Sequence, residues 1–387
     1  MKQKVNILIV GNAYSPHISR IIKHIYQNTD LINIDFYNYS KAKEHTPEIS
    51  EFCNNIYYRA SFFPAILYKI PFLNTVLSLL DFKYTIKKKI NKSFDFIHIH
   101  YITIHSIFFS KLYRRHSKVL VLSAWGSDVL RASPLKIHFM KNLFNKMNYI
   151  TLSKTGYRDK IQSIFKFPDS KIIDVRIGSE MIDMLYKNQD INKTESKKRL
   201  GFEDKYIITI GYNGAKAQNH LNVIEQINLI KDSLPINLFL MLPMTYPSEN
   251  QEYISEVKSK IEEYNIPYVI YDKYLSNEIL LLVRKCTDIF IHAQQTDAAA
   301  ASVQEYILAD SLILNAAWLD YPHLEKFGEV YFTFETFDAI GKKLLYAIKN
   351  KEAVKVPEAL KIELYNRGWE KSINPWIDFY LNTSKSL

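Results

Sequence analysis

The chain has 387 residues, of which 47% are apolar and 23% are charged, and this balance excludes a largely disordered protein. Its two cysteines exclude a disulfide framework and a zinc site built from four thiolates. Residues 1–180 hold 27 lysines and arginines against 12 aspartates and glutamates, whereas the remainder holds 23 against 28. The net charge of +10 therefore belongs to the first half, which points to an anionic partner such as a membrane or a nucleic acid.

Short runs of β-branched and aromatic residues alternate with longer amphipathic stretches, which predicts parallel sheets built from βαβ units. The predicted strands of the first half are Val5–Val10, Ile32–Tyr37, Phe96–His98, Val119–Ser123, Tyr149–Leu152 and Ile172–Arg176. Those of the second half are Tyr206–Ile210, Leu238–Met241, Tyr268–Ile270, Ile289–His292, Leu312–Asn315 and Val330–Phe332. Helical periodicity fills most gaps, for example over His17–Gln27, Asn219–Ser233, Glu252–Glu263 and Phe337–Lys349.

The segment 188–198, NQDINKTESKK, is polar and lacks apolar periodicity, so we expect an interdomain linker there. The predicted fold class is α/β, with two doubly wound Rossmann-like domains over residues 1–185 and 186–365. A C-terminal helix over 366–387 is expected to pack back on the first domain. Ligands bind beyond the carboxyl ends of such strands, so the cleft between the domains is the expected site. The chain contains neither a signal-peptide core nor an apolar run of spanning length, which favours the cytoplasm.

Polar residues follow the predicted strands of the first half. The turn after the first strand begins at Gly11 and lacks the glycine pattern of nicotinamide-binding folds, so it is either an ordinary turn or part of the cleft lining. His98 and His100 lie on one face of a strand end and either bond the neighbouring backbone or serve the site. Asp128, in the segment that begins at Trp125, either caps the next helix or takes part in the site. No third ligand stands at metal spacing, so no metal site is predicted.

The most informative stretch of the second half is residues 294–310, QQTDAAAASVQEYILAD. It follows a buried strand, and four consecutive alanines open the predicted helix. Small side chains at a helix start let an anion approach the first-turn N–H groups, which the helix dipole favours. Asp297 precedes Glu305 by eight residues. A purely structural alternative is a helix that Asp297 caps.

This strand, small-residue helix start and acid-x7-Glu pattern resembles the donor-binding segment of GT-B glycosyltransferases, especially retaining family 4. Further segments agree with the resemblance in order along the chain: 171–181, 196–202, 210–216, 242–246 and 318–321. The segments 211–213, 219–220 and 244–246 also resemble the fucosaminyl transferases of enterobacterial common antigen. The chain departs from the family 4 pattern where Asp297 replaces Glu, Trp125 replaces His, Gly11 lacks a second glycine, and Lys216 stands without an arginine.

The resemblance implies a transferase that moves a sugar from a nucleotide-sugar to a glycan or undecaprenyl-linked glycan acceptor in bacterial surface polysaccharide synthesis, such as lipopolysaccharide or capsule. A hexosyl or N-acetylhexosaminyl donor, a retaining and metal-independent route, and no cofactor are expected. The implied donor-binding residues are Gly11, Asn213, Lys216, Thr296, Ala300, Ala301, Ser302, Val303 and Glu305. The implied catalytic residues are Asp128, His100 and Asp297, and those on the acceptor side are Tyr14, His98 and Trp125.

Within this implied mechanism, Lys216 and the N–H groups of residues 300–303 stabilise the leaving diphosphate. Glu305 would bind ribose hydroxyls and Asp297 the sugar hydroxyls. An inverting route would need a base, for which Asp128 and His100 are the candidates. A sugar-nucleotide epimerase of the same fold is the first alternative. A nucleic-acid-binding protein would explain the basic half but not the acidic second half, so no nucleic acid partner is expected.

The segment Ile56–Ile90 is rich in aromatic, leucine and isoleucine residues and carries the cluster Lys87, Lys88 and Lys89. Its helices are either packed on the first domain's sheet or form an interfacial segment. Apolar residues beside a basic cluster favour the second interpretation. We therefore expect salt-sensitive, peripheral docking on the anionic cytoplasmic face of the inner membrane.

Overall fold

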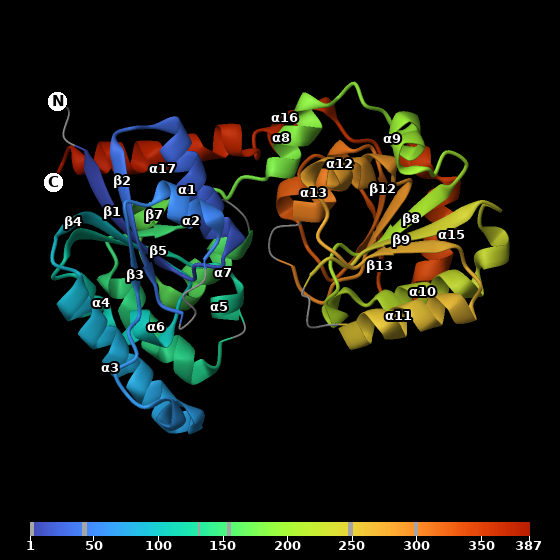
Figure 1. Cartoon of the computed structure of the whole chain (residues 1–387). Helices are drawn as coiled ribbons and strands as arrows, with labels where there is room; N and C mark the ends of the chain where they lie inside the picture. Colours follow the sequence, from blue (N-terminus) through green and yellow to red (C-terminus); the bar gives the residue numbers. More distant parts are fainter. Residues whose placement is uncertain (1–3, 41–44, 131, 153–155, 247–250, 298–300) are drawn as a thin grey trace. The chain divides into compact units, whose positions relative to one another are not determined.

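The chain folds into two compact units in the computed structural model, which describes residues 4–40, 45–130, 132–152, 156–246, 251–297 and 301–387. Unit 1 comprises Met1–Gly178 together with Trp369–Leu387, and unit 2 comprises Ser179–Gly368. Figure 1 shows each unit as a sheet with helices on both faces. Each unit is thus a doubly wound α/β layer structure.

Unit 1 is built on a seven-stranded sheet with the order β3-β2-β1-β4-β5-β6-β7. All of its strand pairs are parallel. Because helices cover both faces, the central strands are apolar almost throughout, as in VNILIVG of β1. The strands are β1 Val5–Gly11, β2 Ile32–Asn38, β3 Asn55–Tyr58, β4 Phe94–His100, β5 Ser117–Ser123, β6 Tyr149–Thr151 and β7 Ile172–Ile173.

The helices of unit 1 include one from the far end of the chain. Helix α17 (Trp369–Ser384) packs on α1 (Pro16–Asn28), and its buried Trp369 and Trp376 belong to the same apolar cluster as Ile7 of β1. The other helices are α2 Pro47–Phe52, α3 Pro71–Lys89, α4 Ile104–Tyr113, α5 Ser127–Leu130, α6 Pro134–Lys146 and α7 Gly156–Phe165. Short 3₁₀ turns cover Ala65–Lys69 and Asp169–Lys171.

Unit 2 has a six-stranded parallel sheet with the order β10-β9-β8-β11-β12-β13. Its strands are β8 Tyr206–Ile210, β9 Leu238–Pro243, β10 Tyr268–Tyr271, β11 Ile289–His292, β12 Leu312–Ala316 and β13 Phe332–Phe334. Its helices are α8 Glu180–Lys187, α9 Lys193–Leu200, α10 His220–Leu229, α11 Gln251–Glu263, α12 Asn277–Cys286, α13 Ala301–Leu308, α14 Pro322–Glu325, α15 Ile340–Lys349 and α16 Glu358–Tyr365. Short 3₁₀ turns cover Lys216–Gln218, Lys231–Ser233, Phe337–Ala339 and Lys351–Ala353.

The expected interdomain linker at 188–198 is wrong, because this segment lies inside unit 2 and much of it is α9. Asn192 caps α9 by accepting a hydrogen bond from the Glu195 N–H at 2.9 Å. Gly201 ends the helix in the left-handed conformation with φ of 75°. The Lys197 ammonium binds the Asp288 carboxylate at 2.6 Å. Polar contacts rather than an apolar stripe therefore hold this helix in place.

Candidate active site

The carboxyl ends of β8, β11 and β12 gather a group of polar side chains at one edge of the unit 2 sheet. We call the group formed by Tyr212, His292, Gln294, Asp297 and Tyr321 the unit 2 edge. Tyr212 follows β8, His292 ends β11, and Tyr321 lies beyond β12. In doubly wound sheets this edge is where ligands bind.

Asp297 is the central acid of the unit 2 edge. Its Oδ2 accepts a hydrogen bond from the Tyr321 hydroxyl at 3.0 Å and lies 3.8 Å from His292 Nε2. Burial, reinforced by the Asp297 charge, raises the pKa of Tyr321, so this hydroxyl remains a donor. Burial also lowers the pKa of His292, against the opposing effect of Asp297. The carboxylate is thus held in position by a neutral phenol beside a neutral imidazole.

Gln294 ties the unit 2 edge together. Its Oε1 accepts a hydrogen bond from the Tyr212 hydroxyl at 2.7 Å, and its backbone carbonyl accepts one from Trp318 Nε1 at 2.9 Å. The turn after β8 is fixed to the same loop, since Asn219 Nδ2 donates to the Ala293 carbonyl at 2.7 Å. The loops after β8, β11 and β12 are therefore cross-linked before any ligand arrives.

The turn after β8 contains the predicted donor residues Asn213 and Lys216. Gly211 begins the turn with φ of 63°, and a Cβ there would lie 2.9 Å from His220 Nε2, so glycine is required. Asn213 is buried, and its side-chain oxygen accepts a hydrogen bond from the Ala215 N–H at 2.9 Å. Lys216 is exposed, with its ammonium 5.6 Å from the centroid of the Tyr253 ring. Asn213 thus shapes the turn, and Lys216 presents its charge to solvent.

The start of α13 carries the remaining predicted donor residues. Thr296 and Ala301 are exposed, whereas Ser302 and Val303 are buried. Ala300 lies outside the described residues. The first N–H groups of a helix have no partner within that helix, so this start offers donors to an anion.

Glu305, which was expected to bind ribose hydroxyls, is buried, with only 8% of its surface accessible. Its Oε2 accepts a hydrogen bond from Arg284 Nε at 3.0 Å, and its Oε1 accepts one from the Ser179 hydroxyl at 3.0 Å. Arg284 also donates to the Tyr306 hydroxyl at 2.8 Å. A ribose hydroxyl at Glu305 would have to compete with Ser179, and the carboxylate has a structural role in any case.

In unit 1, His98 at the end of β4 is fully buried and both of its ring nitrogens are engaged. Nδ1 is hydrogen-bonded to the Tyr380 hydroxyl at 2.5 Å and Nε2 to the Ser123 hydroxyl at 2.8 Å. Burial lowers the pKa of His98 well below its ordinary value. In this structure the His98 imidazole joins β4 and β5 to helix α17, and neither ring nitrogen is left for an acceptor.

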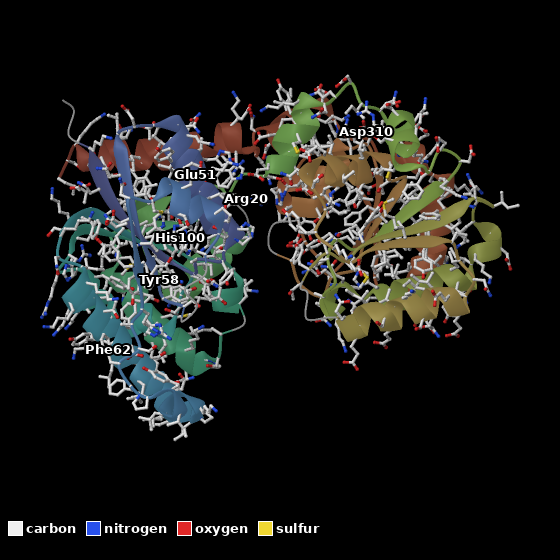
Figure 2. The ribbon with its side chains drawn as sticks, viewed as in Figure 1. Arg20, Glu51, Tyr58, Phe62, His100 and Asp310 are labelled. Atoms are coloured by element: carbon white, nitrogen blue, oxygen red, sulfur yellow. The ribbon has the colours of Figure 1, made fainter. Side chains whose placement is uncertain are left out.

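His100 is also fully buried, but neither of its ring nitrogens has a hydrogen-bond partner among the described residues. Its ring lies 4.2 Å from that of His98 and 5.8 Å from that of Trp125, measured between centroids. Burial lowers the pKa of His100 to about 3. Figure 2 labels His100 within unit 1. The imidazole is neutral near pH 7 and is a weak base there.

Asp128 bridges the loops that follow β4 and β5. Its Oδ2 accepts a hydrogen bond from the Ile102 N–H and its Oδ1 one from the Trp125 N–H, each at 2.9 Å. The residue is buried, and burial raises the pKa of its carboxyl against the effect of these hydrogen bonds. Since both oxygens already bind backbone donors, the structure gives Asp128 a positioning role for these two loops. Trp125, which is partly buried, owes its position to this contact.

Gly11 and Tyr14 belong to the turn between β1 and α1. A Cβ on Gly11 would lie 2.5 Å from Ile18 Cδ1, so this glycine allows α1 to approach the sheet closely. The Ala13 N–H donates to the Asn38 side chain at 3.3 Å, which fixes the turn to β2. Tyr14 is exposed beside it. The structure thus gives Gly11 a packing role and leaves Tyr14 accessible.

Sequence reasoning missed several residues that organise these two edges. Arg284 and Ser179 hold Glu305, and Tyr380 holds His98, yet each comes from an element far away in the chain. The only sequence signal for a buried Arg284 is the run of apolar residues that precedes it in α12. Tyr321 stood in a segment used for the family resemblance, but its contact with Asp297 carried no local signal.

The described residues contain no group of three or more His, Cys, Asp or Glu side chains arranged to hold a metal ion. Among the same residues, no helix is both long and apolar enough to cross a membrane.

The sequence matches the family model of 4-alpha-L-fucosyltransferases, glycosyl transferase group 56, over residues 115–298. This range is under half of the chain and runs from β5 of unit 1 to the loop after β11 in unit 2. It includes both Asp128 and Asp297. No protein of curated function matches the sequence.

Solved structures match almost the whole chain at low identity. Anabaena HepE, solved with UDP and glucose, is 12% identical with a TM-score of 0.67, covering 99% of this chain and 100% of its own. Sucrose-phosphate synthase of Thermosynechococcus elongatus is 10% identical with a TM-score of 0.72, covering 99% of this chain and 100% of its own. The chain has the GT-B fold. The UDP-forming trehalose-phosphate synthase of Burkholderia vietnamiensis is similar as well, at 10% identity and a TM-score of 0.66, covering 99% of this chain and 98% of its own.

Proposed function

We propose that the protein transfers a fucose-type sugar from a nucleoside diphosphate donor to a glycan or undecaprenyl-linked glycan in bacterial surface polysaccharide synthesis. The observation that carries the proposal is the match to group 56 fucosyltransferases, because it takes in the polar residues after β8 and β11. Fucose lacks the 6-hydroxyl of an ordinary hexose. The proposed donor sugar is therefore more specific than the hexosyl or N-acetylhexosaminyl donors expected from the sequence. The GT-B structures of HepE, solved with UDP, support a nucleotide donor for this chain.

In the proposed reaction, the bond between the anomeric carbon and the diphosphate oxygen breaks, the acceptor hydroxyl oxygen forms the new bond to that carbon, and the hydroxyl proton passes to the leaving diphosphate. Negative charge then develops on the leaving diphosphate. The N–H groups at the start of α13 and the exposed Lys216 ammonium are suited to stabilise this charge. Asp297, oriented by Tyr321, is suited to accept hydrogen bonds from sugar hydroxyls.

The residues of unit 1 favour a route that needs little help from a protein base. Asp128 has both oxygens engaged by backbone N–H groups, and His100 is a weak base near pH 7. A retaining transfer fits these properties better than an inverting one. Comparing the anomeric configuration of the product with that of the donor by NMR tests this part of the proposal.

The test of the activity is a thermal-shift panel of UDP, GDP, TDP, ADP and CMP, followed by transfer assays with the nucleotide-sugar of the base that binds. We expect one nucleoside diphosphate to raise the melting temperature and its fucose-type sugar to be transferred. If no nucleotide binds, the donor site is rejected. If the bound nucleotide-sugar is epimerised and no acceptor is needed, the protein is an epimerase of the same fold.

We further propose that unit 1 docks on the anionic cytoplasmic face of the inner membrane through the start of α3 and the turn before it. The large apolar side chains of this region are exposed, with 82% of Phe72 and 70% of Ile66 accessible. We call the group formed by Phe62, Phe63, Ile66, Ile70 and Phe72 the apolar tip. The other face of α3 is buried, which agrees with packing on the first domain, whereas the exposed apolar residues support the interfacial alternative for part of Ile56–Ile90.

Hydrogen bonds to Asp81 of α3 fix the chain around the apolar tip. One carboxylate oxygen of Asp81 accepts a hydrogen bond from the Phe62 N–H at 3.1 Å, and the other accepts one from the Tyr68 hydroxyl. Thr85, one turn later, accepts a hydrogen bond from the Ala60 N–H at 3.0 Å. Figure 2 shows Phe62 beside α3. Because the tip is ordered before it meets a bilayer, insertion has a smaller entropic cost.

A further inference from the structure

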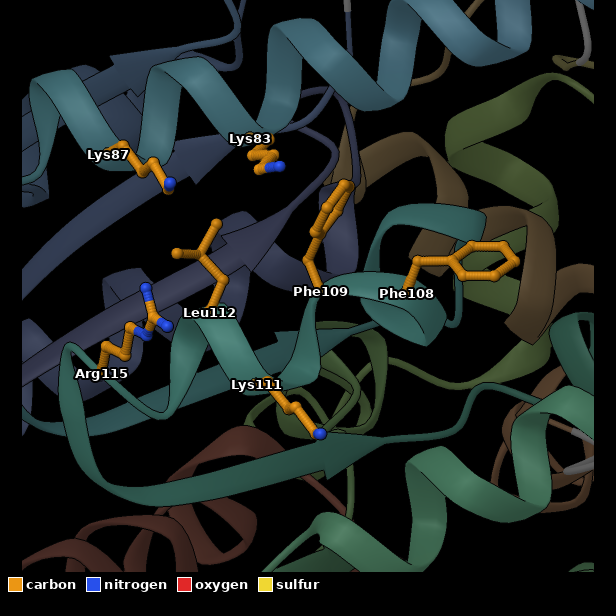
Figure 3. A pocket seen from close by; sticks show the side chains of 7 residues that line it. All are labelled: Lys83, Lys87, Phe108, Phe109, Lys111, Leu112 and Arg115. Atoms are coloured by element: carbon orange, nitrogen blue, oxygen red, sulfur yellow. The ribbon is translucent and has the colours of Figure 1, made fainter.

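A groove lies between α3 and α4 in unit 1, with a cavity volume of about 270 Å³. Its lining residues come from these two helices and the turn that follows α4, as Figure 3 shows. They are Lys83, Lys87, Phe108, Phe109, Lys111, Leu112 and Arg115. Four cations and three apolar side chains thus share one surface depression.

The four cations form two pairs with a spacing of four residues, Lys83 with Lys87 and Lys111 with Arg115. Like charges at this spacing on a helix repel each other. None of the four has an ion pair or hydrogen bond through its side chain to any described residue. The fold therefore holds four unneutralised positive charges around one groove.

The stretch of sequence that forms the groove contains few acids. Between Phe52 and Ser127 the sequence holds eleven lysines and arginines but two aspartates, Asp81 and Asp95. Asp81 is buried under the apolar tip, and Asp95 lies 3.3 Å from the Lys118 ammonium. Charge complementarity thus calls for an anion from outside the chain.

We propose that this basic groove binds the phosphate headgroup of an acidic phospholipid. The phosphate would sit among the four cations, and the apolar wall formed by Phe108, Phe109 and Leu112 suits the glycerol and upper acyl carbons better than a free anion. Exposed Leu80 and Tyr84 continue this apolar surface along α3 toward the apolar tip. An amphiphile is the partner that uses both the charges and the apolar wall.

The inference deepens the membrane docking proposed above, since it names the lipid class and the residues that bind it. It does not depend on the transferase activity. The lipid site is tested by vesicle binding. If the protein does not bind acidic vesicles, the proposed nucleotide binding and sugar transfer are unaffected. If it binds no nucleotide and transfers no sugar, the vesicle result still tests the lipid site.

The experiment compares co-sedimentation with vesicles of phosphatidylcholine alone and of phosphatidylcholine with phosphatidylglycerol. The groove variant carries Lys83→Gln, Lys87→Gln, Lys111→Gln and Arg115→Gln, all at exposed positions. The control variant carries the same loss of charge elsewhere on unit 1, through Lys141→Gln, Lys160→Gln, Lys166→Gln and Lys371→Gln, also at exposed positions. Circular dichroism checks that both variants are folded. If the groove variant is unfolded, the double variant Lys87→Glu and Arg115→Glu replaces it in the experiment.

We expect the wild type to prefer the acidic vesicles and the groove variant to lose about 1,000-fold in partitioning onto them, since each of its four lost cations contributes about 1 kcal/mol near an anionic surface. The control variant should keep most of its binding. Equal losses in the two variants would overturn the proposal, because the attraction would then be diffuse. Equal binding of the wild type to both vesicle types would overturn it as well.

Two soluble competitors separate the lipid from other anions. Inorganic phosphate at constant ionic strength should not release the protein from acidic vesicles, and full release would assign the groove to a free anion instead. A single-stranded oligonucleotide should bind the wild type and the groove variant equally, or bind neither. If it binds the wild type but not the groove variant, the partner is a nucleic acid and the lipid assignment is wrong.

Discussion

Arg284 and Glu305 form a buried ion pair, in which Arg284 Nε donates to Glu305 Oε2 at 3.0 Å. Arg284 lies on α12 and Glu305 on α13, so the pair joins two neighbouring helices of unit 2. Ser179 and Tyr306 complete the hydrogen bonding of the two charged groups. A buried pair of this kind is costly to break from one side, since the remaining charge is left without a partner.

Glu305→Gln should therefore destabilise the protein by about 2–4 kcal/mol, because the Arg284 charge would lose its counterion. The free energy of unfolding in urea measures this loss. Ser179→Ala should cost about 1 kcal/mol, since it removes one hydrogen bond to the carboxylate. If Glu305 also binds the donor ribose in place of Ser179, Ser179→Ala will raise nucleotide affinity, because it removes the competing hydroxyl, while Glu305→Gln lowers it. An unchanged unfolding free energy in Glu305→Gln would contradict the structural role of the pair.

Tyr321→Phe removes the hydroxyl that orients Asp297 and little else. We expect transfer to slow by about 10-fold or more, since a hydrogen bond to a charged group contributes about 1.5–3 kcal/mol. Binding of the free nucleoside diphosphate should be unaffected, because the proposed contact of Asp297 is with the sugar. Steady-state kinetics and nucleotide titrations measure the two quantities separately. A parallel loss of nucleotide affinity would place Asp297 at the nucleotide.

Asp128→Asn should be destabilising by about 1–3 kcal/mol, because an amide can accept the hydrogen bond of only one of the two backbone N–H groups. Its NH₂ group would face the other donor, from Ile102 or Trp125. A simple helix cap would tolerate the change, since Asn and Asp cap equally well. Thermal unfolding checks the prediction, and nucleotide affinity should stay the same. A fully stable Asp128→Asn variant would show that one accepted hydrogen bond is enough.

The buried histidines should make the protein sensitive to mild acid. Burial lowers the pKa of His100 and His220 to about 3 and that of His105 to about 4, with His98 well below its ordinary value. The unfolded chain, with histidine pKa values near 6.5, binds more protons than the folded chain between these values and about pH 6.5. Stability is then present above pH 6.5 and is lost as the pH falls, by up to about 1.4 kcal/mol per pH unit for each histidine. Urea unfolding at pH 7.5, 6.0 and 5.0 tests this, and a flat profile would contradict it.

Docking through the apolar tip predicts that Ile66→Ser with Phe72→Ser weakens vesicle binding. Burying each of these side chains in the interface contributes about 1–3 kcal/mol, so the pair should lower partitioning by about 100-fold. Leu229→Ser with Ile236→Ser is the matched control, because these residues are exposed apolar side chains of unit 2. Vesicle co-sedimentation at high salt isolates the apolar contribution. If both double variants partition onto vesicles equally, the apolar tip is not part of the docking surface.

Much of the sheet architecture could be predicted, because buried parallel strands are apolar almost throughout. The bounds of Tyr206–Ile210 and Ile289–His292 agree with β8 and β11, and the GT-B fold is confirmed. The edge strand β3 was missed, since its residues are only partly buried. Distant polar contacts place it, among them the hydrogen bond from the Tyr57 hydroxyl to Asp35 at 3.0 Å. A local pattern cannot carry such information.

The candidate site was less predictable than the fold. The sequence placed Asp128, His100 and Asp297 at or just after the carboxyl ends of predicted strands, and the structure agrees. Such ends share one side of a parallel sheet, which is where ligands bind. The protonation and hydrogen bonding of these residues depend on partners from remote elements. Glu305 illustrates this, because Ser179 and Arg284, which determine its burial, lie 126 and 21 residues away.

Helix α17 gives unit 1 an unusual order of assembly. Its side chains Trp369, Ile373 and Trp376 belong to the apolar cluster that covers β1 and α1, yet they are synthesised after the whole of unit 2. Until they emerge, the apolar residues of unit 1 that this helix covers lack their partners, and exposed apolar surface of this kind makes a partly folded chain prone to aggregation. A stop codon shortly before Trp369 would therefore damage the half of the protein that was synthesised first.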